Sequence, residues 1–300
     1  MNDLRSYDVV ILGRGPAGLQ SAIHAARKKV AVLVLGKDHK SSLYRAHIEN
    51  FCCMFKASGE EILATGHQQA SRFGTEFLDE DVLSVENKND GFLLTTEGGI
   101  QIHCAALVIA TGIKRAQLGI PGEKEFIGKG VSYCVDCDGH FYKGETVAVL
   151  GAESAAVDGA LTLSQIGAGV HLVCDQLSVS EALKARLAQS PVQIHAGRKA
   201  KAIQGTQQVT GLQLDDNTIL DVTGVFIEQG AKGLMELATR LGIRLDDEMR
   251  HIQTDKQQAT NVEGVYAAGD ICGPPWQMAK AVGEGCVAGI AAATYAKQRK

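Results

Sequence analysis

Short apolar runs, each followed by a glycine-containing turn and an amphipathic stretch, recur along the chain. Such runs are typical of strands buried on both faces of a parallel sheet, and the stretches between them are typical of helices that cover it. The order strand, helix, strand occurs twice, at residues 7–12, 16–27 and 30–35 and again at 146–150, 154–166 and 170–173. The pattern therefore predicts two βαβ units in an α/β fold.

The two units have the same internal spacing. Gly13 precedes Leu35 by the same interval as Gly151 precedes Val173. A repeat of this kind, with a glycine-rich turn after its first strand, is typical of nucleotide-binding domains, so we expect two of them. Two more short strands and a final helix rich in small residues are predicted at residues 105–110, 264–268 and 279–295.

The composition is that of a globular protein with a large core. Hydrophobic residues fill 45% of the 300 positions. The net charge of −4 gives no reason to expect nucleic acid or a membrane as partner, and no apolar run approaches the ~20 residues that span a bilayer. Because the first strand begins near residue 7, we expect no signal peptide. Eight cysteines are too few for a disulfide scaffold, which favours a reducing, cytoplasmic location.

The first glycine-rich loop, GRGPAG at residues 13–18, has the pattern of a dinucleotide site. In such loops the first glycine makes the turn, the second admits a pyrophosphate, and the third lets the helix pack on the strand. Amides at the start of the following helix then face the phosphates. The residues expected at this site are Gly13, Gly15, Pro16, Ala17 and Gly18. No acidic residue ends the next strand, where Leu35-Gly36-Lys37 stands, so the ribose must be held in another way.

The second loop, GAESAA at residues 151–156, differs at its central position. Glu153 stands where a glycine would admit the pyrophosphate, and it adds a side chain and a negative charge. Two like charges about 4 Å apart repel by about 4 kcal/mol at an effective dielectric constant of ~20, which would weaken binding roughly a thousandfold. Alternatively, Glu153 turns outward and a dinucleotide still binds. Asp175, after the following strand, suits the ribose of NADH, whereas no arginine stands there for the 2′-phosphate of NADPH.

Cys134 and Cys137 lie between the two loops in a Cys-Val-Asp-Cys motif. Cysteines at this spacing form a small-ring disulfide, and one of them can act as a nucleophile. Asp138 follows directly and is placed to move a proton to a leaving thiolate. The alternative, half of a zinc site, lacks a second Cys-x-x-Cys or paired-histidine motif, so we expect no metal. We expect most other cysteines in the core, and the adjacent Cys52 and Cys53 are candidates for a secondary redox role.

Taken in order, the motifs resemble those of the low-molecular-weight bacterial thioredoxin reductases along nearly the whole chain. They are GRGPAG at residues 13–18, Glu49-Asn50-Phe51, Ala110-Thr111-Gly112, SYCVDCDG at residues 132–139, and Ala267-Ala268-Gly269-Asp270. The resemblance implies two Rossmann-like three-layer α/β domains. An FAD domain at residues 1–115 and 243–300 is split in sequence by an inserted, degenerate NAD(P)-type domain at residues 116–242. The resemblance also implies a homodimer.

The same resemblance implies roles for individual residues. FAD, one per chain, would bind the first loop and also contact Asn50, Thr111, Gly112, Gly269, Asp270, Trp276 and Gln277. Gly269 and Asp270 would hold the ribityl and phosphate region, and Gln277 would approach the isoalloxazine. Cys137 would face the flavin, Cys134 would attack a thioredoxin-like protein, and Asp138 would be the acid.

Several positions depart from the family. Its NADPH domain usually has a glycine-rich loop where Glu153 stands, His-Arg-Arg in place of Cys174-Asp175-Gln176, and a proline-and-asparagine turn at residues 228–233. In the FAD domain, Trp276 replaces an arginine before Gln277. These departures resemble the pyridine-nucleotide-independent branch, which takes electrons from reduced ferredoxin, and a related diflavin branch that binds a second FAD. We therefore expect an FAD-dependent disulfide oxidoreductase supplied by ferredoxin. The alternatives are an NADH-dependent disulfide reductase, a diflavin enzyme and a non-catalytic flavin redox sensor.

Overall fold

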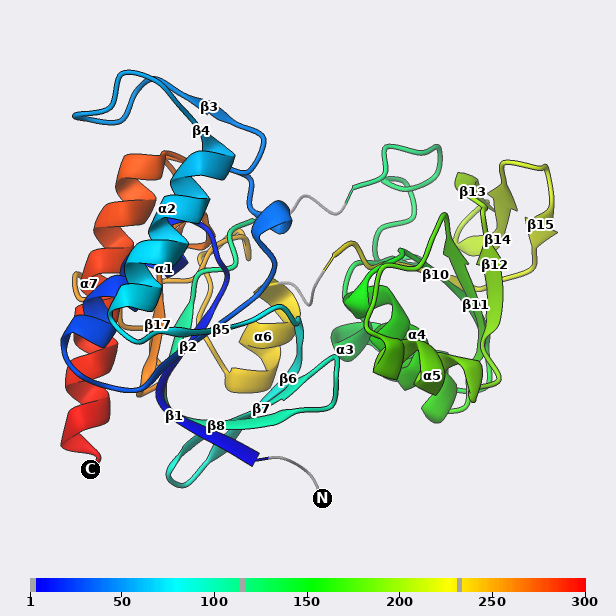
Figure 1. Cartoon of the computed structure of the whole chain (residues 1–300). Coiled ribbons are helices and arrows are strands. Elements are labelled where there is room, and N and C mark those ends of the chain that lie inside the picture. Colours follow the sequence, from blue (N-terminus) through cyan, green and yellow to red (C-terminus); the bar gives the residue numbers. More distant parts are fainter. Residues whose placement is uncertain (1–3, 114–116, 231–233) are drawn as a thin grey trace. The chain divides into compact units, whose positions relative to one another are not determined.

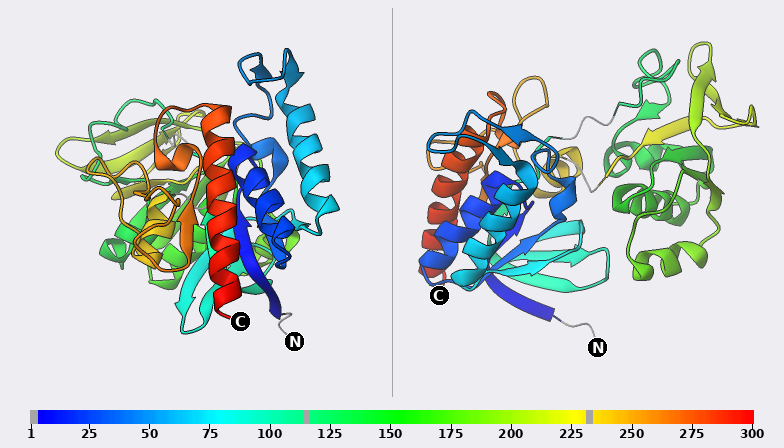
Figure 2. Two further views of the ribbon diagram at one scale, coloured as in Figure 1. Left: turned by 90° about the vertical axis from the view of Figure 1, so that its left-hand side faces the viewer. Right: turned by 45° about the horizontal axis from the view of Figure 1, so that its top comes forward.

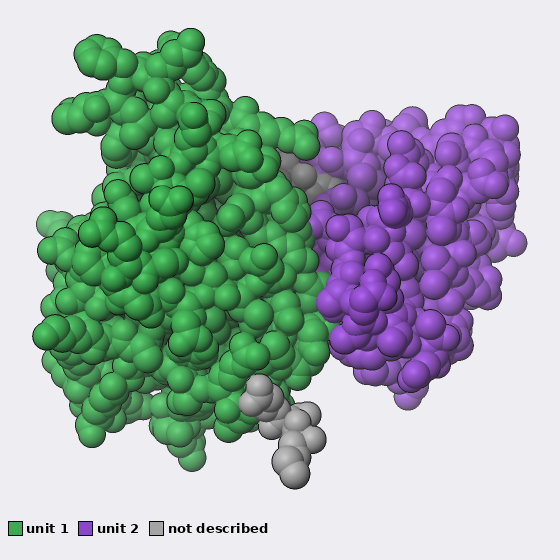
Figure 3. Space-filling model, in the orientation of Figure 1, with its two compact units in different colours: residues 1–113, 237–300 green, residues 114–236 purple. Residues whose placement is uncertain are grey.

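The computed structural model of the chain describes residues 4–113, 117–230 and 234–300 (Figure 1). It divides into unit 1, residues 1–113 with 237–300, and unit 2, residues 114–236 (Figure 3). Unit 2 is therefore inserted in the sequence of unit 1. The first expected domain boundary, between residues 115 and 116, lies outside the described residues, and the expected division after residue 242 stays a prediction.

The elements of unit 1 come from two segments that lie far apart in the sequence. They are β1 (Leu4–Leu12), α1 (Pro16–Arg27), β2 (Val32–Leu35), the 3₁₀ helix η1 (Asp38–Lys40), β3 (His47–Ile48), β4 (Ala57–Ser58), α2 (Gly59–Arg72), β5 (Glu76–Leu78), β6 (Val82–Lys88), β7 (Gly91–Thr96), β8 (Gln101–Ile109), β17 (Val265–Ala267), the 3₁₀ helix η3 (Asp270–Cys272) and α7 (Met278–Gln298). The chain returns from unit 2 to unit 1 within α6 (Leu234–Leu241).

A mainly parallel sheet forms the centre of unit 1. Its strand order is β5–β2–β1–β8–β7–β6, and β17 pairs with the end of β8. β1 runs parallel to β2 and β8, whereas β6 and β7 form an antiparallel extension. Val9, Val10 and Ile11 of the central strand β1 are fully buried. Burial on both faces explains why this strand is a continuous apolar run rather than an alternating one.

Helices α1 and α7 lie side by side on one face of this sheet (Figure 2). Small residues line their contact, so the two backbones come close. Gly285 of α7 lies against the carbonyl oxygen of Ala17, and Gly289 lies against that of Ser21. The buried Ser21 hydroxyl is 2.8 Å from the carbonyl oxygen of Ala17 and 2.9 Å from that of Gly285. Helix α7 thereby fixes α1, whose first turn follows the first glycine-rich loop.

Unit 2 has a second parallel sheet with its own helices. Its elements are β9 (Val131–Ser132), α3 (Val135–Asp138), the 3₁₀ helix η2 (Gly139–Tyr142), β10 (Thr146–Leu150), α4 (Ser154–Gln165), β11 (Gly169–Cys174), α5 (Glu181–Ala188), β12 (Gln193–Ala196), β13 (Ala200–Gly205), β14 (Val209–Leu214), β15 (Ile219–Leu220) and β16 (Gly224–Ile227). The strand order of the sheet is β12–β11–β10–β16–β9, and all of its pairs are parallel.

The sheet of unit 2 is covered on both faces. Ala148 and Leu150 of β10 pack with residues of the antiparallel ribbon β13–β14–β15. Because side chains alternate along a strand, Val147 and Val149 point to the opposite face, where α4 packs on β10 and β11. The α/β fold class with two Rossmann-like layered units, predicted from the repeat, is confirmed.

Some elements are longer than the sequence pattern predicts, and others were not predicted. The apolar run at residues 105–110 is only the end of β8, and α7 extends beyond residues 279–295 at both ends. Helix α2 and the antiparallel strands of both units are additions to the predicted set. Among the described residues, no helix is both long enough and apolar enough to cross a membrane.

Substitution of Gly285 by alanine tests the close approach of α1 and α7. The added methyl group would overlap the carbonyl oxygen of Ala17, and overpacking of this kind typically costs about 1–3 kcal/mol. Gly283→Ala is the matched control in the same helix, because no described atom lies within 4 Å of its added methyl group. In a helix interior alanine is favoured over glycine by about 1 kcal/mol. Urea unfolding should show a lower midpoint for Gly285→Ala and an equal or higher midpoint for Gly283→Ala, and equal loss in both variants would contradict the packing.

Candidate active site

Three loops meet at one edge of the sheet in unit 1. β1 pairs with β8 as far as Leu12, and β17 pairs with the same end of β8. The segments that follow these three strands carry Gly13, Thr111 and Gly269. Ligands of open α/β sheets bind at the carboxyl ends of the strands. The fold thus brings together three motifs that are far apart in the sequence.

The glycines of the first loop have different surroundings. A Cβ atom on Gly13, where φ is +109°, would overlap the carbonyl oxygen of Ala110. One on Gly18 would overlap the carbonyl oxygen of Gly13. A Cβ atom on Gly15 would instead have Ser41 Oγ, at 3.4 Å, as its nearest contact. Packing therefore requires the first and third glycines, whereas the second leaves room for a ligand.

The start of α1 is suited to an anion. The helix begins at Pro16 after Gly15, and in the described residues no side chain caps it. Free amide groups and the positive end of the helix dipole attract phosphate at such a position. The pyrophosphate of FAD therefore fits this loop, and the roles of Gly13, Gly15, Pro16, Ala17 and Gly18 as its ligands stay a prediction.

The turn at Gly269 and Asp270 is fixed beside α1. Gly269 has a φ of +88°, and a Cβ atom there would lie 2.9 Å from that of Ala17. Its N–H donates to Glu284 at 2.8 Å, and Lys280 donates to its carbonyl oxygen at 2.9 Å. Burial raises the pKa of Asp270, and nearby Lys280 opposes that shift. The position of the turn, next to the first turn of α1, agrees with its expected place along an extended cofactor.

Asn50 and Gln277 are brought into contact. The Asn50 amide donates to Gln277 Oε1 at 2.9 Å, which joins the loop after β3 to the start of α7. Trp276, the preceding residue, is 54% exposed. Thr111 and Gly112 follow the end of β8, and Thr111 lies next to Gly13. The expected flavin contacts of these residues stay predictions.

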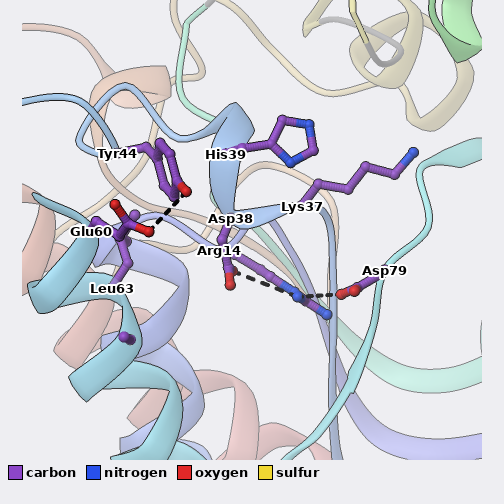
Figure 4. A pocket seen from close by; sticks show the side chains of 9 residues that line it. Arg14, Lys37, Asp38, His39, Tyr44, Glu60, Leu63 and Asp79 are labelled. Atoms are coloured by element: carbon purple, nitrogen blue, oxygen red, sulfur yellow. Dashed lines mark hydrogen bonds and ion pairs between the residues drawn. The ribbon is translucent and has the colours of Figure 1, made fainter. Parts of the chain in front are cut away.

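A pocket of about 380 Å³ lies next to the first loop (Figure 4). Its lining residues are Arg14, Lys37, Asp38, His39, Tyr44, Glu60, Leu63, Ala64 and Asp79. The Arg14 side chain extends toward Asp38, 3.6 Å away, and forms an ion pair with Asp79. The Tyr44 hydroxyl donates to Glu60 at 3.0 Å, and this hydrogen bond raises the pKa of Tyr44. Most of the lining residues are polar or charged, and all of them belong to unit 1.

This pocket contains acidic residues that could hold the cofactor's ribose, for which the sequence showed no acidic residue at the end of the second strand. No acidic residue ends β2, but Asp38 begins η1 shortly after it and lines the pocket. The volume of the pocket lies within the usual range for small-molecule sites, about 300–1,000 Å³. We therefore take the pocket as a candidate site for the adenosine half of FAD, in which Asp38 or Asp79 would bond to its hydroxyl groups. The feature of the sequence that could have predicted this role is the acidic residue Asp38, shortly after β2.

In unit 2, Cys134 and Cys137 form a disulfide with a Cα–Cα distance of 5.3 Å. Cys134 is buried and Cys137 is half-buried, on either side of the first turn of α3. The bond favours the redox interpretation over half of a zinc site. In the described part of the chain, no group of three or more His, Cys, Asp or Glu side chains is arranged to hold a metal ion.

Ser132 connects the disulfide with Asp138. Its hydroxyl donates to Asp138 Oδ2 at 2.6 Å and accepts the N–H of Cys134 at 3.1 Å. The N–H of Asp138 also donates to the carbonyl oxygen of Cys134 at 3.1 Å. Asp138, the expected acid, is therefore held beside the disulfide by Ser132, a buried residue that was not among the predicted site residues.

Glu228 links the disulfide segment to the end of β10. This carboxylate is only 4% exposed, and its Oε1 accepts the N–H of Val135 at 2.9 Å. Its own N–H donates to the carbonyl oxygen of Leu150 at 3.0 Å. Residues 228–233 were predicted only to depart from the family, and residues 231–233 lie outside the described residues. The feature of the sequence that could have predicted a role for Glu228 is its position directly after the apolar strand β16.

The second glycine-rich loop is closed by the chain itself. The N–H of Ala155, in the first turn of α4, donates to the carbonyl oxygen of Gly230 at 3.1 Å. Glu153 precedes the helix in an extended conformation, and its side chain does not cap the helix. An amide that a pyrophosphate would use in this loop is therefore already bonded within unit 2.

Comparison with known proteins agrees with these features. The sequence matches the family described as pyridine nucleotide-disulphide oxidoreductase over residues 7–285. It is 32% identical to a thioredoxin reductase of Treponema pallidum (strain Nichols), over 96% of this chain and 97% of that protein. It is also 32% identical to a thioredoxin reductase of Escherichia coli O157:H7, over 98% of each.

Two crystal structures are similar in fold as well as in sequence. The atypical thioredoxin reductase TRi from Desulfovibrio vulgaris Hildenborough has a TM-score of 0.85 and 34% identity, over 97% of this chain and 98% of that chain. A ferredoxin-flavin thioredoxin reductase from Clostridium acetobutylicum has a TM-score of 0.70 and 29% identity, over 98% of each. The family predicted from the sequence is confirmed, and the branch stays a prediction. The chain therefore belongs to the pyridine nucleotide-disulphide oxidoreductase family, as a flavin disulfide oxidoreductase of the thioredoxin reductase type.

Proposed function

We propose that this oxidoreductase takes electrons from reduced ferredoxin, passes them through FAD to the Cys134–Cys137 disulfide and delivers them to a thioredoxin-like protein. The choice of donor rests on the hydrogen bond from the N–H of Ala155 to the carbonyl oxygen of Gly230. This bond occupies an amide at the start of α4, where the pyrophosphate of a nucleotide would bind. Glu153 adds a negative charge to the same loop. The Clostridium acetobutylicum structure, named for ferredoxin and flavin, supports the same donor.

A ferredoxin needs no nicotinamide pocket, because it is a protein that docks on a surface and gives one electron at a time. Two reduced ferredoxins and two protons balance the reduction of one disulfide to two thiols. FAD, when bound in unit 1, supplies the chemistry that joins one-electron donors to a two-electron disulfide. The closed loop of unit 2 is then no obstacle to electron supply.

The residues around the disulfide account for the thiol steps. After reduction, the Cys134 thiolate attacks one sulfur of the partner disulfide and the other partner sulfur leaves as a thiolate. Cys137 then attacks Cys134, which restores the disulfide and releases the second partner thiol. Asp138, positioned by Ser132, supplies the proton that a leaving thiolate takes up.

An NADH-dependent reductase is the second candidate, and Asp175 is the observation that favours it. This residue follows β11 directly, and its side chain is 72% exposed. Its ion pair with Lys199, at 3.7 Å, is exposed to solvent. Exposed ion pairs contribute only about 0–1 kcal/mol to stability. Asp175 is therefore available to a ribose hydroxyl. The exposed Trp276 gives weaker support to a diflavin enzyme, because its ring can stack on a second flavin.

Flavin reduction by different donors tests the proposal. The holoenzyme is mixed anaerobically with NADH, NADPH or reduced ferredoxin, and the flavin absorbance is followed. Ferredoxin should bleach the flavin and NADPH should not, because the second loop is closed. Rapid bleaching by NADPH contradicts the proposal, rapid bleaching by NADH selects the second candidate, and extraction of a second FAD per chain selects the diflavin enzyme. Absence of turnover with every donor, despite a disulfide that can be reduced, indicates a redox sensor.

Glu153→Gly separates the effect of charge from that of the backbone. Glu153 is half-buried, so water reduces the repulsion from the ~4 kcal/mol of a close pair at an effective dielectric constant of ~20 to about 1.4 kcal/mol at ~60, and its removal should tighten NADH binding about tenfold. Glu153→Gln is the matched control, because it removes the charge and keeps a side chain of similar size. Calorimetric titration should show improved but still weak binding in both variants, since the Ala155–Gly230 hydrogen bond remains. Tight binding in either variant would show that this hydrogen bond does not close the loop.

Ser132→Ala tests the positioning of Asp138. Loss of the hydroxyl removes the donor at 2.6 Å from Asp138, and misplacing an acid should lower kcat for a thioredoxin-like substrate by about tenfold or more, with KM little changed. Tyr133→Phe is the control, because it removes a hydroxyl that donates to Glu123 at 2.7 Å and leaves Ser132 in place. Steady-state kinetics and urea unfolding should show a stability loss in both variants and a kcat loss only in Ser132→Ala. An equal fall in kcat in both variants would assign Ser132 a purely structural role.

A further inference from the structure

The loop between β3 and β4 projects from unit 1 (Figure 1). It carries two adjacent cysteines, Cys52 and Cys53, which are exposed. The sulfur atoms of Cys52 and Cys53 lie 3.5 Å apart. Cys104 and Cys174, which lie in strands, are buried, as is usual for this residue type. Phe55, in the same loop, is 100% exposed. The two thiols therefore make no contribution to the core and are accessible to a reagent.

A tight turn brings the two sulfur atoms together. The N–H of Met54 donates to the carbonyl oxygen of Phe51 at 3.1 Å, so Cys52 and Cys53 are the central residues of a β-turn. Cys53 has a φ of +68°, in the left-handed region where this turn position favours glycine or asparagine. A side chain held in that region costs about 1–3 kcal/mol. Neighbouring side chains of an extended chain point in opposite directions, so the turn is what places the thiols side by side.

We propose that Cys52 and Cys53 form a second redox-active dithiol, which reacts with low-molecular-weight disulfides and closes to a disulfide between adjacent residues. One thiolate attacks the small disulfide and releases one small thiol. The other thiolate then attacks the mixed disulfide and releases the second small thiol. Two protein thiols and one small disulfide thus become one protein disulfide and two small thiols, and a reducing dithiol reverses the exchange.

The geometry makes this disulfide easy to reduce. Adjacent Cα atoms lie about 3.8 Å apart across a trans peptide bond, which is shorter than the ~4.4 Å minimum usual for a disulfide. A bond formed here is strained, and strained disulfides have more oxidising potentials. The pair is therefore suited to reversible control rather than to cross-linking. Its loop also carries Asn50, which contacts Gln277, so ring closure acts on a segment next to the proposed flavin contacts.

Tryptic digestion isolates the pair from the other cysteines. Cleavage after Arg45 and Lys56 yields the peptide of residues 46–56, in which Cys52 and Cys53 are the only cysteines. The full-length holoenzyme is reduced with dithiothreitol, desalted, treated with oxidised glutathione and digested. Mass spectrometry should show the peptide lighter by two hydrogen atoms, without glutathione, and restored by dithiothreitol. No electron donor is used, so this result is independent of the result for ferredoxin.

Cys53→Ala is the matched variant, because Cys52 then has no neighbouring thiol. Its peptide should retain one glutathione on Cys52. A wild-type peptide that stays unmodified, keeps glutathione or becomes linked to a second chain overturns the proposal. Ring closure should persist in the Cys134→Ser, Cys137→Ser double variant, and its loss there would show that the ring forms only by exchange with the other disulfide, which also overturns the proposal.

Discussion

The first turn of α1 is the constraint on which unit 1 depends, because backbone atoms contact it closely from several directions. Gly18 packs on the carbonyl oxygen of Gly13, Gly269 lies against the Cβ atom of Ala17, and Gly285 lies against the carbonyl oxygen of the same residue. At each glycine an added Cβ atom would meet another atom too closely. The contacts come from the loop after β1, the turn after β17 and helix α7. The place where a pyrophosphate fits is therefore defined by segments from both ends of the chain.

Unit 2 repeats the βαβ architecture with different contacts at the corresponding helix end. Helix α4 also follows a glycine-rich loop, but the segment after β16 bonds to its first turn through Gly230. The same segment bonds to the redox motif through Glu228 and Val135. One short stretch of backbone thus joins the second loop to the disulfide. In the proposed function, unit 2 serves as a support for the disulfide, and the cofactor chemistry belongs to unit 1.

Local patterns predicted the parts of the structure that depend on short windows of sequence. The loop at residues 13–18, the repeated βαβ units and the Cys134–Cys137 pair all have fixed spacings that physical rules explain. Asp38 and Glu228 were not assigned roles because their importance depends on what the folded chain places beside them: Arg14 in one case and the N–H of Val135 in the other. Strands β13 and β14 were missed because polar residues and glycines interrupt them, so no continuous apolar run marks them. Helix α2 was missed although its capping box, Ser58 with Glu61, is readable in the sequence.

The hydrogen bond between Ala155 and Gly230 joins two backbone groups, and a backbone group persists whatever side chain its residue carries. Substitution of Glu153 by glycine changes one side chain, but it leaves this hydrogen bond in place. Under the proposed function, a pyrophosphate could reach this amide only if the chain after β16 followed a new path. The specificity of the second loop would then be set by the path of a backbone segment, which substitution of a single side chain does not change.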